Sequence, residues 1–275
     1  MYIVHEQYEQ ANEEYTKAFE ANGVQFAKDL NNAFYSAAYS KNIKLANHYI
    51  DTFAFYGYSK EIIEENIQKY KLAPVCISLS FDSIQNLGKQ TVDWNWIRKC
   101  DSFANVDHEI RTREEPVSDR EMMIVDSINF FSFLAEIDQN GFPEFRRIGF
   151  FCQRFGDPYI ASSFTFVLWH QRGMKRNDSF ENRLIRLVKK GWLLPYDYAV
   201  ARYVKYDYYG FVPTDYASAE TIETFNKHRS AIYMDSVSEF KEKMHRKFSI
   251  NGTDVYSLIP FVFHNAFVDP SYENR

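Results

Sequence analysis

A histidine near the middle of the chain has the chemistry that proton transfer requires. His170 follows the apolar run TFVLW at residues 165–169. An imidazole exchanges a proton near neutral pH when a carboxylate fixes its tautomer. We therefore consider His170 a candidate general base, with Asp126, or another carboxylate, as the catalytic residue that orients it. The alternative interpretation, a hydrogen-bonded structural histidine near the core, is the commoner case for a histidine in such a position.

Asp107 and Arg111 are a second pair, four residues apart in a segment that we expect to be helical. On a helix they lie on one face and form an ion pair, which contributes about 0.3–0.5 kcal/mol when exposed. In the functional alternative, Arg111 binds an anionic ligand and Asp107 orients it. Arginine suits that role because its planar guanidinium binds carboxylate or phosphate through two parallel hydrogen bonds.

Asp126 and Asn129 are three residues apart on a helix otherwise rich in phenylalanine. Polar side chains in such surroundings need hydrogen-bond partners. They either meet Arg111 in a structural network or line a polar pocket that binds a ligand, and both interpretations stay open. We expect the polar residues of these segments to meet in space.

The other signatures of enzymatic sites are absent from the sequence. His170 has no HExxH, HxH or carboxylate cluster at ligand spacing near it, so we predict no metal. Cys152 and His170 form no catalytic arrangement with a third group. Glycine-rich nucleotide loops, GxSxG and kinase signatures do not occur, and the chain has only 10 Gly. We predict no cofactor.

Basic residues concentrate in the middle of a chain whose formal net charge is -5. Residues 144–190 hold ten Lys or Arg against four Asp or Glu, a charge of +6, which leaves -11 for the rest. The stretch 172–190 is either a solvated helix face or a surface for an acidic protein partner. Nucleic acid is the weaker interpretation, because a net acidic protein would have to present this patch alone.

The sequence has no run of 18 apolar residues and no segment typical of export, so we expect a cytoplasmic protein without a membrane contact. The three cysteines, Cys76, Cys100 and Cys152, form no CxxC pair, and we expect reduced thiols in the core.

The spacing of apolar residues predicts a mainly α fold, an irregular helical bundle with N-terminal tetratricopeptide-like helical hairpins. Residues 1–72 should form these hairpins, with helices at about 6–22, 24–40, 41–56 and 59–69. Residues 73–94 are expected to connect them to a helical domain at 95–275, closed by an apolar tail beyond Asn251 that docks on the body.

The central helix of the second domain is predicted at about 119–139, after one at about 93–113. Ser118 is its expected N-cap and Gly141 ends it. Its apolar residues are predicted to face the core: Ile124, Ile128, Phe131, Leu134 and Ala135. Residues 162–170 suit a buried helix or a strand, and we favour the helix. Ser236 and Glu239 form a predicted capping box.

Residues 94–202 resemble an uncharacterised family of bacterial domains, common in Bacteroidetes, whose function is unknown. The shared pattern is Asp-Gln-x-x-Arg, Asp-x-x-Asn, Gly-[Trp or Phe]-Pro with a following Gly, a His after an apolar run, and Tyr-Ala before Asp-Arg. Here these positions are Asp107, Arg111, Asp126, Asn129, Gly141, Phe142, Pro143, Gly149, His170, Ala199 and Arg202. This chain departs from the pattern at His108, where the family has Gln, and at Ala201, where it has Asp.

The resemblance supplies candidate residues and no activity. Two functions fit them. The first is a protein-binding module in which the Asp, Asn, Arg and His residues form a buried structural network. The second is a hydrolase- or transferase-like enzyme that uses His170 as general base, with Arg111 and Arg202 binding an anionic group of the ligand.

Overall fold

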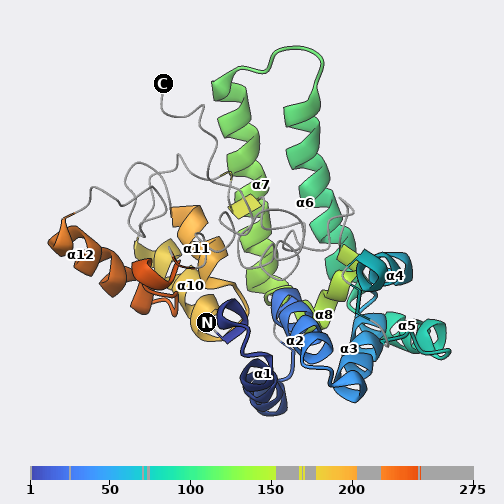
Figure 1. Ribbon diagram of the computed structural model, residues 1–275. Helices are drawn as coiled ribbons and strands as arrows, with labels where there is room; N and C mark the ends of the chain where they lie inside the picture. Colours follow the sequence, from blue (N-terminus) through green and yellow to red (C-terminus); the bar gives the residue numbers. More distant parts are fainter. Residues whose placement is uncertain are drawn as a thin grey trace.

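The computed structural model describes residues 2–24, 26–69, 71–72, 75–152, 167–168, 170, 178–202, 218–240 and 242. All regular secondary structure within these residues is helical (Figure 1). The prediction of a mainly α, irregular helical bundle is therefore confirmed. No helix in the described part of the chain combines the length and the apolar character that crossing a membrane requires.

The N-terminal helices follow the predicted ranges to within three residues at each end. A short 3-10 helix, η1 (Tyr2–His5), precedes α1 (Tyr8–Asn22), α2 (Ala27–Tyr39), α3 (Ile43–Phe55) and α4 (Lys60–Lys69). Small and aromatic residues alternate in α2 and α3, so these two helices approach closely. Their shared core is closed to solvent: Leu30, Ala33, Tyr35, Ile50, Phe53 and Ala54 are each at most 2% exposed.

Helix α5 (Phe81–Lys89) lies within the segment predicted to be a connection. Phe81 is buried in the same core as α2 and α3. Gly88 allows the backbones to meet, because a Cβ at this position would lie 1.7 Å from the carbonyl oxygen of Phe55. Residues 75–89 thus belong to the N-terminal core, and the sequence did not show this because the helix has only nine residues among turn formers.

Two long antiparallel helices, α6 (Trp94–Thr112) and α7 (Asp119–Asn140), stand side by side above the rest of the molecule (Figure 1). The side chains of Asp93 and Ser118 accept hydrogen bonds from the backbone NH groups of Trp96 and Glu121, which caps each helix at its start. Gly141, at φ 76°, ends α7 in the left-handed region that glycine adopts without strain. The predicted cap and stop of α7 are confirmed.

The predicted inner face of α7 is confirmed at Leu134 and wrong at its other residues. Ile124, Ile128 and Phe131 are 50%, 62% and 57% exposed, and Ala135 is also exposed. The residues that face α6 and the second core are Asn129, Phe130 and Phe133, with Leu134 packed at the edge of that core. The helix is rotated relative to the predicted orientation because its polar residues have their partners on α6. A buried polar group without a partner costs more free energy than an isoleucine exposed to water.

The segment after α7 joins the two cores through α8 (Phe145–Ile148) and the 3-10 helix η2 (Gly149–Cys152). Phe150 packs in the N-terminal core, where its backbone NH donates to the carbonyl oxygen of Tyr56 at 2.8 Å. Arg147 pairs with Asp93 at 2.7 Å and donates to the carbonyl oxygen of Asn140 at 2.6 Å. One arginine thus fixes the start of α6 to the end of α7.

The second core is completed by α10 (Asp178–Lys189), α11 (Pro195–Arg202) and the residues that follow α12 (Ala219–Ser230). Leu184, Val188, Leu193, Tyr198 and Ile232 pack against Trp96, Cys100 and Phe133. The capping box is confirmed, since the backbone NH of Ser236 donates to the Glu239 carboxylate at 2.8 Å and the NH of Glu239 donates to the Ser236 hydroxyl at 3.3 Å.

Other predictions fall partly on residues outside the described ranges. Val167 and Leu168 are helical and buried, as predicted for 162–170, whereas residues 162–166 and 169 lie outside them. So does the tail beyond Asn251. Cys100 is buried and forms no disulfide, but Cys76 is exposed, so the predicted place of Cys76 in the core is wrong.

Candidate functional site

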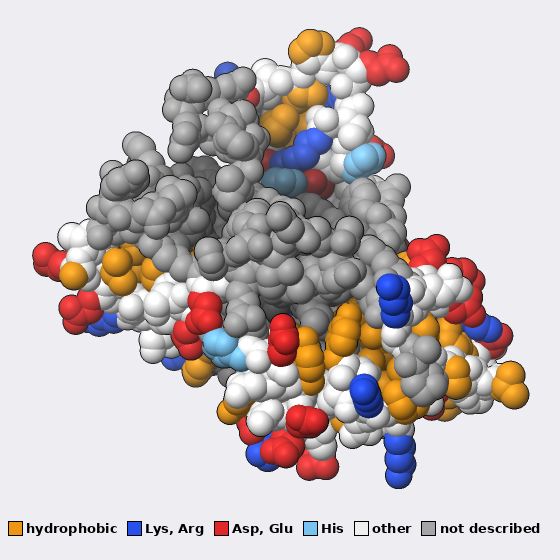
Figure 2. Space-filling model, in the orientation of Figure 1, with side chains coloured by type: hydrophobic (Ala, Val, Ile, Leu, Met, Phe, Trp, Pro, Cys, Tyr) orange, Lys and Arg blue, Asp and Glu red, His pale blue; other side chains and the backbone are white. Residues whose placement is uncertain are grey.

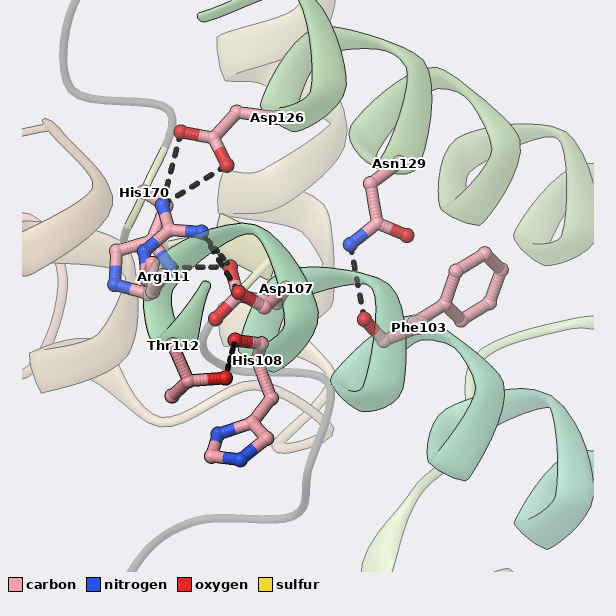
Figure 3. Close-up of polar contacts among 8 residues, drawn as sticks. All are labelled: Phe103, Asp107, His108, Arg111, Thr112, Asp126, Asn129 and His170. Atoms are coloured by element: carbon pink, nitrogen blue, oxygen red, sulfur yellow. Dashed lines mark hydrogen bonds and ion pairs between the residues drawn. The ribbon is translucent and has the colours of Figure 1, made fainter. Parts of the chain in front are cut away.

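Four of the predicted polar residues meet between α6 and α7. Asp107 and Arg111 come from α6, Asp126 from α7, and His170 from a turn that follows Val167 and Leu168 (Figure 3). The cluster lies where the two long helices are still in contact, above the apolar contacts of Phe103 and Phe133. On the face shown in Figure 2, acidic, basic and histidine side chains gather in a recess beside the upper parts of these helices.

Asp107 is the centre of the cluster. Its Oδ1 lies 2.8 Å from Nη1 of Arg111 and 2.5 Å from Nδ1 of His170. Only 10% of its side chain is exposed. A carboxylate with so little water around it needs hydrogen-bond donors, and the guanidinium and the imidazole supply them.

Arg111 links the two helices. Its Nη2 donates to both carboxylate oxygens of Asp126 at 2.9 Å, while Nη1 contacts the Asp107 carboxylate and donates to the backbone carbonyl of Asp107 at 3.1 Å. The four-residue spacing on α6 brings the Asp107 and Arg111 side chains to the same face. Arg111 then reaches across to α7, so one guanidinium holds two carboxylates.

His170 completes the cluster through its Nδ1 atom. The second ring nitrogen points away from both carboxylates (Figure 3), and 21% of the side chain is exposed. When Nδ1 carries the proton that Asp107 accepts, Nε2 is the basic nitrogen of the ring. The carboxylate therefore fixes the tautomer that proton transfer at Nε2 requires. We expected Asp126 in this role; the structure gives it to Asp107.

Burial raises the pKa of the Asp126 carboxyl above its ordinary range. The hydrogen bond and positive charge of Arg111 lower it, as does the positive charge of His170, and the negative charge of Asp107 raises it. The increase in pKa that desolvation of the carboxylate causes is thus larger than the decrease that the arginine causes. Only 11% of this side chain is exposed, so the ion pair compensates incompletely for the loss of water.

The same groups include a set of metal-ligand atoms. One oxygen each from Asp107 and Asp126 and one ring nitrogen of His170 lie within 4.8 Å of one another. Mixed carboxylate and imidazole donors suit first-row divalent ions. The guanidinium of Arg111, however, already contacts both carboxylates and supplies the positive charge between them. The sequence analysis named all three residues as candidates but predicted no metal, because they come from separate segments without ligand spacing.

The remaining predicted site residues lie elsewhere. Asn129 donates through Nδ2 to the carbonyl oxygen of Phe103 at 3.0 Å and is buried, so it ties α7 to α6 one turn below the cluster. This contact is structural and makes a ligand-binding role unnecessary. Arg202 ends α11, and its side chain lies outside the described residues, as do residues 172–177 of the basic stretch 172–190.

The described part of that basic stretch divides into paired and exposed charges. Arg183 pairs with Asp138 at the lower end of α7, and Lys190 lies over the Trp192 ring with 4.3 Å between its Nζ and the ring centroid. Arg186 and Lys189 are exposed on α10. Both interpretations of the stretch, solvated face and docking surface, therefore stay open for its exposed charges.

Sequence reasoning missed Arg147 as an organising residue of this region. Its pairing with Asp93 and with the end of α7 holds the base of the α6–α7 pair. The signal in the sequence was indirect: Arg147 lies between Gly141 and Gly149, both at positive φ, where the chain turns sharply and brings a side chain back to the helix ends.

Comparison with known proteins adds no relative. No family profile matches the chain, and neither the curated proteins nor the solved structures contain a match. The resemblance to the bacterial domain of unknown function therefore stays a hypothesis that rests on the short motifs.

Proposed function

We propose that this protein is an enzyme of hydrolase or transferase type in which His170 transfers a proton. The observation that carries the proposal is the 2.5 Å contact between Nδ1 of His170 and the Asp107 carboxylate. A carboxylate on Nδ1 leaves Nε2 to accept a proton from a water or hydroxyl nucleophile, and the resulting imidazolium can return it to the leaving group.

The other two charged residues position this pair. Arg111 contacts the same Asp107 oxygen as the histidine does, and Asp126 holds Arg111 through both of its carboxylate oxygens. The chain of contacts thus runs from Asp126 through Arg111 and Asp107 to His170. A general base gains from such a fixed arrangement, because proton transfer requires its nitrogen within hydrogen-bond reach of the substrate.

The charges also bear on the class of substrate. With the imidazole unprotonated, as a general base requires, two carboxylates and one guanidinium give the cluster a formal charge of -1, and both terminal nitrogens of Arg111 contact carboxylates. We therefore assign Arg111 a positioning role in place of the anion binding expected from the sequence. A neutral or cationic ester, amide or glycoside suits the site better than a phosphate monoester does. Arg202 stays a predicted anion-binding residue.

The reactivity of His170 tests the Asp107–His170 pair directly. Diethyl pyrocarbonate acylates the unprotonated imidazole nitrogen, and peptide mass spectrometry gives the rate at each histidine. We expect His170 to react several-fold faster in the wild type than in Asp107→Asn, while the exposed His108 reacts at the same rate in both. An unchanged rate at His170 would contradict the proposed pair.

Turnover tests the enzymatic role. The probes are p-nitrophenyl acetate, a neutral ester, and p-nitrophenyl phosphate, an anionic one, each assayed with the wild type, His170→Gln and the control His108→Gln. We expect hydrolysis of the acetate to fall at least tenfold in His170→Gln and to persist in the control. Equal rates in all three proteins would remove the support for catalysis at this site.

A second candidate function is a protein-binding module, with the cluster as a structural network. The observation that favours it is that Arg111 joins α6 to α7 through both carboxylates. The exposed Arg186 and Lys189 on α10 would then contact an acidic partner. In this case His170→Ala destabilises the fold, whereas the enzyme proposal expects a nearly unchanged melting temperature, because His170 lies at the partly exposed edge of the cluster.

We also propose a cytoplasmic location. Neither Cys76, which is exposed, nor Cys100, which is buried, forms a disulfide, and cysteines outside disulfides suit a reducing compartment.

A further inference from the structure

A second link between α6 and α7 lies directly below the polar cluster. Nδ2 of Asn129, on α7, donates to the backbone carbonyl oxygen of Phe103, on α6, at 3.0 Å (Figure 3). Asn129 is only 5% exposed, so water cannot readily replace this hydrogen bond. The amide therefore holds the two helices at a fixed separation.

The carbonyl that Asn129 contacts belongs to the helical turn that carries Asp107. In an α-helix each carbonyl oxygen accepts from the backbone NH four positions later, so the Phe103 carbonyl is the helical partner of the Asp107 NH. A carbonyl oxygen has two lone pairs and can accept from both donors. A single acceptor thus joins the Asn129 side chain to the backbone of Asp107.

Asp107 lies between two links that join the helices. Below it, Asn129 donates to the Phe103 carbonyl; above it, Arg111 contacts Asp126 at 2.9 Å. Phe103, Asp107 and Arg111 follow one another at intervals of four residues on α6, which places them on one face. Because α7 runs antiparallel to α6, Asn129 and Asp126 meet the two ends of this row. The separation of the helices at Asp107 is thus fixed from both sides.

We propose that Asn129 is a positioning residue, which holds the Asp107 carboxylate in contact with His170. This inference rests on the proposed function, since it concerns the same proton transfer. The distance between Asp107 Oδ1 and His170 Nδ1 is 2.5 Å, and a hydrogen bond weakens steeply when its geometry changes. A displacement of about 1 Å at a catalytic group can lower a rate about 100-fold. A link that fixes the Asp107 backbone therefore bears directly on proton transfer.

The Arg111 link alone fixes the Asp107 backbone less tightly. The guanidinium ends a flexible side chain that is 23% exposed and contacts another side chain, whereas the short Asn129 amide contacts the α6 backbone itself. The rings of Phe103 and Phe133 pack edge to face one turn lower, and apolar contacts are not directional. The Asn129 hydrogen bond therefore sets the register of α6 against α7 just below the site.

Proton NMR of the full-length protein tests the positioning directly. A proton in a short hydrogen bond between an imidazole nitrogen and a carboxylate resonates far downfield of ordinary amide protons. We expect such a resonance in the wild type, and its absence from His170→Gln identifies it. Asn129→Leu replaces the amide by an apolar side chain of similar size. We expect this variant to shift the resonance upfield or to abolish it.

The matched control is Asn12→Leu. Asn12 is a buried asparagine of α1 whose Nδ2 donates to Ser40 Oγ at 2.7 Å, in the N-terminal part of the molecule. Both substitutions remove a buried amide and its hydrogen bond, but only Asn129 is linked to the site. Asn12→Leu should therefore leave the downfield resonance in place.

Turnover of p-nitrophenyl acetate gives a second measurement. Asn129→Leu should lower kcat about tenfold and leave KM nearly unchanged, because it displaces the base without touching the substrate. Asn129→Gln keeps an amide donor on a longer side chain and should retain more of kcat and of the resonance. If Asn129→Leu does not fold, Asn129→Ser takes its place, since its hydroxyl ends one bond short of the amide nitrogen.

Two results would overturn the positioning role. In the first, Asn129→Leu loses stability as Asn12→Leu does but keeps the resonance and kcat of the wild type. In the second, the Leu and Gln variants lose equally, which would show that packing at this position matters and the donor does not. A wild type that leaves the ester intact, but whose resonance responds to Asn129→Leu as expected, would refute the enzymatic function and support the positioning of Asp107.

Discussion

The α2–α3 and α6–α7 helix pairs are built on opposite principles. In α2–α3 the contact is apolar: Phe34 and Phe53 meet edge to face, with 5.7 Å between ring centroids, and both are nearly inaccessible to water. In the upper half of α6–α7 the contact is made by Asp107, Arg111 and Asp126. The apolar residues of α7 at that height lie on the outside.

The difference shows what each pair is suited to do. An apolar contact between helices is insensitive to pH and tolerates no water, which suits a scaffold. A contact made of partly exposed charges costs desolvation energy that it only partly recovers, so it is a weak way to join two helices. Such an arrangement is better explained by a site that needs charges than by stability, and this supports the proposed role of His170.

The largest expected effect comes from removing a ring of the apolar pair. Phe53→Ala should lower the free energy of unfolding by about 3–5 kcal/mol, because it leaves a cavity beside Phe34, Tyr58 and Phe150. Phe131→Ala, at a side chain of α7 that is 57% exposed, should cost about 1 kcal/mol or less. Urea unfolding of both variants measures the contrast; similar losses would mean that the two faces are equally buried in solution.

A smaller loss is expected from breaking the polar contact. Asp126→Ala removes both hydrogen bonds from Nη2 of Arg111 but leaves Arg111 paired with Asp107. We expect a loss of about 1–3 kcal/mol, typical of hydrogen bonds to a charged group. His170→Ala, measured in the same way, is the matched variant and should cost less than Asp126→Ala. A larger loss for His170 would favour the structural network of the protein-binding module.

The pH dependence separates the two pairs further. Since burial raises the pKa of Asp126 in the folded state, its protonated form favours folding: this contribution is complete below the ordinary pKa of the group and is lost as the pH rises through the folded-state value. Asp126→Asn imitates the protonated form. Relative to the wild type, it should therefore become more stable between about pH 3 and pH 7.

Unfolding of both proteins at a series of pH values measures this difference. Asn32→Ala, a change of a buried residue in α2 that carries no charge, is the control and should shift stability equally at every pH in that range. A stability difference between Asp126→Asn and the wild type that moves in the opposite direction would show that Arg111 outweighs the desolvation of Asp126.

The smallest effect is expected at the exposed ion pair beside the loop that joins α6 to α7. Arg113 and Glu121 lie 2.9 Å apart, with about half of each side chain in water. Arg113→Ala should cost less than about 0.5 kcal/mol, because solvent screens such pairs. Thermal unfolding at low and high salt checks this value, and a loss comparable to that of Asp126→Ala would show that the loop contributes to holding the hairpin together.

The local features of the fold were determined by the sequence alone. Helix ranges, the Ser118 cap, the stop at Gly141 and the Ser236–Glu239 capping box follow from residues that are neighbours in the chain. The spacing of Asp107 and Arg111 likewise placed them on one helix face. These interactions depend on hydrogen bonds within a few residues, so the sequence contains all of their partners.

The orientation of α7 and the pairing of His170 were decided by the tertiary structure. Apolar residues of α7 occur on both sides of the helix, with Ile124 and Ile128 on one and Phe130 and Phe133 on the other, so their spacing could not tell which side is buried. Asp107 and His170 are 63 residues apart, and either carboxylate was a chemically sound partner for the imidazole. The ion pair between Arg111 and Asp126 orients this side of α7 toward α6, because a charge that is excluded from water must pair with an opposite charge.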